Sequence, residues 1–175
     1  MKASEFVEGL KGISVRTDLL KKQGVSDQFI EDRKRSYLAA YKGGASVSQY
    51  PLVELVENYD CSNLEIGMIT FDERIEEKGR FIFFGRFEVD DLAVDLTTGS
   101  VVMLECGLDH ILYDCAQNDS SFLEAILNTA VFLERRSVEE GLYENEELNI
   151  QMAEEFGDIA GGEKYYDFYK MMLGV

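Results

Sequence analysis

Few residues of this chain could do chemistry, and none stands in a known catalytic motif. The single histidine is His110, and no serine occupies a G-x-S-x-G turn. No Gly-rich segment has the spacing of a phosphate-binding or dinucleotide-binding loop. Because base catalysis also needs a partner that orients the histidine, a lone histidine is more often structural than catalytic. The sequence therefore predicts no catalytic residues and no bound cofactor.

Three aspartates near a predicted turn are the one arrangement that could bind a metal ion. Asp90, Asp91 and Asp95 offer the oxygen ligands that calcium prefers, but the EF-hand spacing and its closing glutamate are missing. The Asp90-Asp91 pair also suits a turn, and strand alternation places Asp95 on the face opposite Val94. We favour the turn interpretation and expect no metal site, with a metal-dependent enzyme as the remote alternative.

The three cysteines do not form a recognisable set. Cys61, Cys106 and Cys115 are odd in number and have no C-x-x-C spacing, which argues against a disulfide framework or a zinc knuckle. We expect Cys106 and Cys115 to be buried as small apolar residues. The start of the chain lacks the apolar region of a signal peptide, and no run of about 18 apolar residues suggests a membrane span. The expected location is the cytoplasm.

Acidic residues dominate the chain, and they are distributed unevenly. The net charge is −17; residues 1–42 hold nine basic and six acidic residues, whereas residues 43–175 hold eight basic and 28 acidic residues. Such a surface repels nucleic-acid phosphates, because duplex binding needs lysines and arginines. It would attract a basic protein and speed its encounter. The alternative is that the acids only keep the protein soluble, and the sequence leaves the oligomeric state open.

Eight acidic residues in two segments are the predicted partner contacts. They lie in a turn of the strand-rich middle and after the long helix that follows it: Glu88, Asp90, Asp91, Glu139, Glu140, Glu144, Glu146 and Glu147. The alternative for the second group is a solvated loop and helix start, where acids complement the positive end of the helix dipole. The aromatic stripe Tyr165–Tyr169 suits an interface or, as we favour, a docked C-terminal helix.

Helices at both ends and strands in the middle must position these side chains in a single domain. The three parts are a helical segment 1–45, a strand-rich core 50–106 and a helical segment 119–175. Helices are predicted over 4–10, 26–41, 121–136, 145–156 and 163–173. Ser26 can cap the second helix and Gly43-Gly44 can end it, while Ser121 and Glu124 form a capping box for the third.

The strand-rich middle predicts an antiparallel meander. Short runs rich in β-formers cover 64–71, 80–84, 92–96 and 100–104. Thr97-Thr98-Gly99 is a tight hairpin loop, and Gly85 to Asp91 is predicted to be a longer turn. Short connections require antiparallel neighbours, whereas residues 51–59 fit a helix as well as a strand. The fold class is therefore α+β, with a central, mainly antiparallel sheet and helices packed on it.

Three motifs of the middle of the chain form a recognisable series: Asp95-Leu96-Thr97-Thr98-Gly99, Val101-Val102, and Asn118-Asp119-Ser120-Ser121-Phe122-Leu123 opening a helix. In these motifs, residues 80–136 resemble the SUKH superfamily, which includes the yeast Smi/Knr cell-wall-synthesis regulators and many bacterial immunity proteins. Residues 145–173 are similar to the helical tail of one immunity subgroup, without the tryptophan often seen there. The matching positions are turns and caps, so they carry the fold rather than binding residues.

The resemblance implies a binding protein that neutralises a basic toxin domain, often a nuclease or a deaminase. A regulatory or scaffold module that binds a housekeeping partner is the alternative. Both interpretations imply a protein partner rather than a cofactor, a nucleic acid or a membrane.

Overall fold

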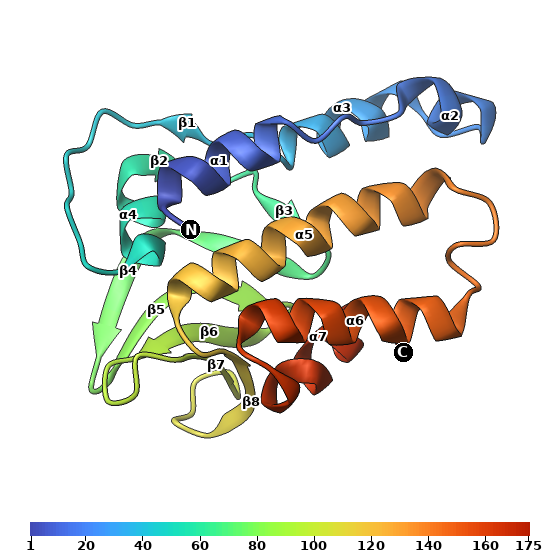
Figure 1. Cartoon of the computed structure of the whole chain (residues 1–175). Coiled ribbons are helices and arrows are strands. Elements are labelled where there is room, and N and C mark those ends of the chain that lie inside the picture. The colour runs from blue at the N-terminus through green and yellow to red at the C-terminus, as the bar shows by residue number, and fades with distance from the viewer.

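A six-stranded antiparallel sheet, in which neighbours in sequence are neighbours in space, forms the centre of the molecule (Figure 1). The computed structural model describes residues 1–175. The sheet contains β3 (Glu65–Ile66), β4 (Ile69–Lys78), β5 (Phe81–Phe87), β6 (Asp90–Asp95), β7 (Val101–Leu104) and β8 (Ile111–Ala116). A separate antiparallel pair consists of β1 (Ala40–Tyr41) and β2 (Tyr59–Asp60). The predicted α+β class and antiparallel meander are confirmed.

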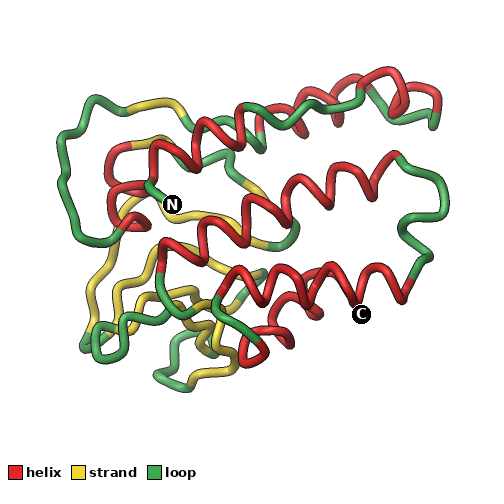
Figure 2. The backbone as a smooth tube through the Cα atoms, viewed as in Figure 1, coloured by secondary structure: helices red, strands yellow, loops and turns green.

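The helices come from both ends of the chain, with α4 from the middle. They are α1 (Ala3–Lys11), α2 (Thr17–Lys22), α3 (Asp27–Arg35), α4 (Pro51–Asn58), α5 (Asp119–Val138), α6 (Glu146–Ala160), the short 3-10 helix η1 (Glu163–Tyr165) and α7 (Tyr166–Leu173). Figure 2 shows the strands of the six-stranded sheet gathered in one region, with the long helices beside it. None of these helices combines the length and apolar character needed to cross a membrane.

The sheet has two apolar faces of very different size. Strand alternation points Ile82, Leu92 and Val94 toward the helices, where they join the main core with residues of α1, α4, α5, α6 and α7. The opposite face carries a small separate cluster of Phe81, Ala93, Val102 and Leu104. One face of the sheet is therefore the floor of the main core, and the other face buries a second, smaller apolar cluster.

The C-terminal helix is docked on the body, as the aromatic pattern predicts. Phe168 and Tyr169 are fully buried, and Tyr165 is nearly so. The Tyr169 hydroxyl donates a 3.1 Å hydrogen bond to the carbonyl of Cys115 in β8. Three of the four aromatic residues of the stripe therefore belong to the core, while Tyr166 is partly exposed.

Several predicted boundaries are wrong at the N-terminal end. Ser26 does cap a helix, since its side chain accepts from the amide of Phe29 at 3.2 Å, but that helix ends at Arg35 rather than at Tyr41. Residues after Arg35 lead into β1, and Gly43-Gly44 follows that strand instead of ending a helix. Helix α2 is an element that the sequence pattern did not predict.

The strand-rich middle also differs from its prediction. The run 64–71 is two strands joined by a turn at Gly67, whose φ of 60° suits glycine. Residues Gly85 to Asp91 are not a long turn, because β5 continues to Phe87 and β6 begins at Asp90. Strand β8 was not predicted, and residues 51–58 form a helix that begins at Pro51.

The long helix α5 begins two residues earlier than predicted and uses a different cap. The Asn118 side chain accepts from the amide of Ser121 at 2.8 Å, so Asn118 is the N-cap. The predicted capping box of Ser121 and Glu124 does not form, because Ser121 already lies within the helix.

Candidate functional site

The first predicted group of acids surrounds the hairpin between β5 and β6. Glu88 lies in its two-residue turn with a positive φ of 53°, and it is exposed. Asp90 and Asp91 are half-buried, and their carboxylates accept from the amides of Cys106 and Gly107, each at 3.1 Å. The two aspartates thus hold the loop between β7 and β8, and only Glu88 is fully available to a partner.

The aspartates that could have formed a metal site do not converge. Asp91 lies 3.9 Å from Arg86 in an ion pair. Asp95 is buried at the far end of β6, roughly 13 Å along the strand from Asp91. It pairs with Arg80 at 3.5 Å and accepts from the amide of Thr97 at 2.9 Å. No group of three or more metal-ligating side chains is brought together anywhere in the chain.

The second predicted group lies in the connection between α5 and α6 and in the first turn of α6, away from the sheet (Figure 1). Glu139 pairs with Arg135 at 3.0 Å, and the pKa of its carboxyl is lowered by that hydrogen bond. The other four acids are exposed and have no basic side chain within 4 Å: Glu140, Glu144, Glu146 and Glu147. The structure therefore leaves a strongly acidic segment open to solvent at this end of the molecule.

This acidic segment also carries an exposed aromatic ring that the sequence argument missed. Tyr143 is 69% exposed, and the Arg136 guanidinium lies 5.3 Å from the centre of its ring. Tyrosine is enriched at interfaces because it offers a large rigid surface with a polar tip. Its place among four unpaired acids was readable from the sequence, whereas its exposure was not.

The ion pairs show that almost all of the acids without a cationic partner lie outside residues 1–42. The chain has eleven salt bridges, which leaves 23 of its 34 acids without a cationic partner within 4 Å. Only one of these 23, Glu5, lies in residues 1–42, and the other 22 lie in residues 43–175. The negative field of the protein therefore originates from the sheet and the C-terminal helices.

A cleft of about 420 Å³ lies between the N-terminal helices and α5. Its apolar walls come from Ile13 and Leu19 on one side and from Val131 and Val138 on the other. Figure 1 shows α2 beyond the end of α1 and above the C-terminal half of α5. The residues that line the cleft come from these three helices and from the loops next to them. Of the residues that line this cleft, only Glu139 was predicted as a site residue.

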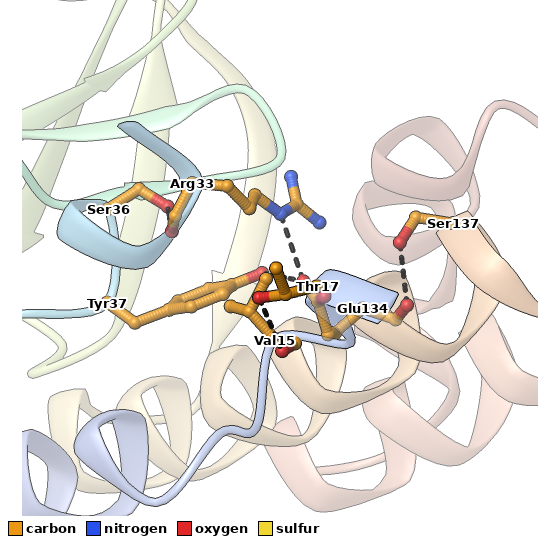
Figure 3. A network of polar contacts seen from close by, with 7 residues as sticks. All are labelled: Val15, Thr17, Arg33, Ser36, Tyr37, Glu134 and Ser137. Atoms are coloured by element: carbon orange, nitrogen blue, oxygen red, sulfur yellow. Dashed lines mark hydrogen bonds and ion pairs between the residues drawn. The ribbon is translucent and has the colours of Figure 1, made fainter. Parts of the chain in front are cut away.

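A buried glutamate lines this cleft. Glu134 is only 4% exposed, and its Oε2 accepts from Arg33 Nε at 3.0 Å and from the Tyr37 hydroxyl at 3.1 Å (Figure 3). Burial raises the pKa of Tyr37, which keeps its hydroxyl protonated and able to donate. Glu134 Oε1 is fully buried and has no hydrogen-bond partner. Leaving such an atom unpaired costs about 1–3 kcal/mol or more for a charged group.

Two further side-chain hydrogen bonds flank this network, one at the end of α3 and one in α5. The Ser36 hydroxyl donates to the Arg33 carbonyl at 2.8 Å, and the Ser137 hydroxyl donates to the Glu134 carbonyl at 2.7 Å. One sequence signal could have found Glu134. It continues the spacing of four from Ile126 and Ala130, so it occupies a core position of an otherwise apolar helix face.

The remaining reactive side chains are spread over the fold. Cys61 and Cys115 are buried, and burial raises the pKa of the Cys61 thiol to about 12 and that of Cys115 well above its usual range. Cys106 is exposed in the loop after β7, so its predicted burial is wrong. That loop also contains His110, which is exposed and makes no side-chain hydrogen bond.

Comparison with known proteins adds no assignment to this geometry. No protein family, curated protein or solved structure matches the chain.

Proposed function

We propose that this chain is a non-enzymatic binding protein that recognises a basic protein, as SUKH immunity proteins recognise toxin domains. The observation that carries the proposal is the separation of charge. In residues 43–175, 22 acids have no cationic partner, whereas the acids of residues 1–42 are almost all paired. An unpaired negative surface attracts and orients a positive partner before contact.

A toxin that cuts or edits nucleic acid is the partner class that fits this surface. Such a protein must be basic around its substrate cleft in order to bind phosphates. An acidic protein that covers the same cleft would compete directly with the substrate. The proposed compartment is the cytoplasm, where the toxin's nucleic-acid substrates lie.

The proposed contact surface is the segment Glu139–Glu147. Its unpaired acids supply attraction, and Tyr143 supplies an exposed anchor at its centre. Interfaces concentrate their binding energy in a few aromatic and arginine residues, while surrounding charges set the rate of encounter. Glu88 is a secondary candidate, because Asp90 and Asp91 are engaged with the loop after β7.

The test is co-expression with the product of the adjacent gene. We expect the two proteins to purify together, and we expect the chain to rescue cells poisoned by that product. Because charge steers the encounter, the association rate should fall about tenfold between roughly 0.02 M and 0.2 M NaCl. A neighbour without a toxin-like domain, together with no rescue, contradicts the proposal. Capture of a housekeeping protein instead favours the regulatory alternative.

Replacement of Tyr143 by alanine is expected to weaken partner binding by about ten- to a hundredfold, which is the effect of removing an aromatic anchor. Calorimetry or surface plasmon resonance measures this change with the purified pair. The control is Tyr41→Ala in β1, because Tyr41 is similarly exposed but packs its ring against Tyr59. Equal losses in the two variants would place the interface elsewhere.

A further inference from the structure

The cleft between the N-terminal helices and α5 contains an acceptor that lacks a donor. Both donors that reach Glu134, from Arg33 and Tyr37, go to Oε2, and Oε1 is left buried without a partner. Native proteins satisfy nearly all buried polar atoms, so an orphaned carboxylate oxygen on a residue that lines a cavity points to a molecule that donates to it.

The shape of the cleft fits a molecule with an apolar body. Val131, Glu134 and Val138 follow one another at spacings of three and four, so they share the face of α5 that lines the cleft. Val131 is 45% exposed although it is apolar, and Ile13 and Leu19 face it from the other wall. A volume of about 420 Å³ is within the range of small-molecule sites.

The charges around the cleft decide what kind of donor fits. The Arg33 guanidinium already balances the Glu134 carboxylate. At the rim, Arg16 is paired with Asp18, Arg135 with Glu139, and Glu8 with Lys11. Every charged side chain that lines the cleft therefore already has a partner of opposite charge, so a charged head group would find no free counter-charge. A neutral O–H or N–H donor needs none.

We propose that this cleft binds a small, neutral amphipathic molecule whose hydroxyl or amide donates a hydrogen bond to Glu134 Oε1, with its apolar body between Val131 and Leu19. This site shares only Glu139 with the proposed protein-binding segment, and its test does not require the protein partner.

The experiment titrates the ¹⁵N-labelled protein with matched probes and follows the amide shifts of Gly9, Gly12 and Ser14, which line the cleft. The probes are 4-butylphenol, which has a donor, and 4-butylanisole, whose methyl ether removes only that donor. We expect the phenol to bind about tenfold more tightly, the effect of one hydrogen bond to a charged acceptor. Protonated 4-butylbenzylamine should bind more weakly than the phenol. Binding of neither neutral probe, or equal binding of both, overturns the proposal.

Two variants test the role of each part. In Glu134→Gln, the amide oxygen can still accept the hydrogen bonds from Arg33 and Tyr37. The NH₂ group, which is a donor, then lies at the position of Oε1. We expect the preference for the phenol to disappear or to reverse in favour of the anisole. In Val131→Phe, the ring fills the cleft from a partly exposed position, so the fold should persist and neither probe should bind. A phenol preference retained in Glu134→Gln, or probe binding retained in Val131→Phe, contradicts the site.

Discussion

Replacement of Phe122 by alanine is expected to lower the free energy of unfolding by about 3–5 kcal/mol, the usual effect of removing a fully buried phenylalanine. Phe122 is 0% exposed in the first turn of α5. Its ring centre lies 5.6 Å from that of Phe84 in β5 and 6.4 Å from that of Phe168 in α7. The substitution therefore leaves a cavity where the sheet, the long helix and the C-terminal helix meet.

Urea unfolding followed by circular dichroism measures this loss. The matched control is Phe29→Ala, which removes the same atoms from a ring that is 55% exposed on α3. Surface substitutions usually change stability by less than about 0.5 kcal/mol. Similar losses of stability in the two variants would show that Phe122 does not hold the sheet, α5 and α7 together.

The parts of the fold that could be predicted are those encoded by short-range patterns. The apolar stripe of α5 and the runs around β5, β6 and β7 are local signals, and they identify the correct elements. The meander then follows, since strands joined by short loops must be antiparallel neighbours. Element ends were less accurate, as with α5, whose cap is Asn118 rather than Ser121.

Gly85 shows why a local signal can mislead. The segment Gly85 to Asp91 was predicted to be a turn, but Gly85 lies inside β5 next to an irregularity in the strand pairing. A Cβ added at Gly85 would lie 2.3 Å from the carbonyl oxygen of Thr70 in the neighbouring strand. The glycine is needed for close approach of two backbones, which only the paired strand reveals.

The cleft could not be predicted because it depends on contacts between distant segments. Tyr37 and Glu134 are 97 residues apart in sequence, and their hydrogen bond forms beyond the end of α3. The apolar residues after Arg35 continue a helical pattern, which extended the predicted helix to Tyr41. In the fold, tertiary contacts of Tyr37 replace that continuation, so tertiary structure overrides local propensity.

The charge asymmetry was visible in the sequence, but its meaning changed with the structure. Counting residues shows that the N-terminal segment is basic and the rest is acidic. The ion pairs add that the acids of the N-terminal segment are largely neutralised, whereas those of the body are not. The predicted contact residues divide accordingly, because Asp90 and Asp91 bond to backbone amides while Glu140 to Glu147 remain free.

Replacement of Glu134 by leucine is expected to destabilise the protein by about 3 kcal/mol or more, because it leaves the Arg33 guanidinium and the buried Tyr37 hydroxyl without their acceptor. The ion pair itself need not be stabilising, since burying two charges removes their hydration. The triple variant Arg33→Met/Tyr37→Phe/Glu134→Leu removes all three polar groups at once. We expect it to recover most of the lost stability, because apolar side chains of similar volume can replace a buried ion pair.

Chemical unfolding of the wild type, the single variant and the triple variant measures these differences. The expected order is that the single variant is least stable and the triple variant approaches the wild type. A triple variant as unstable as the single one would show that the charges stabilise the fold. Recovery would instead indicate that Arg33, Tyr37 and Glu134 are not needed for stability. This buried polar network, with its unpaired Oε1, would then need a role other than stability, and the proposed ligand site supplies one.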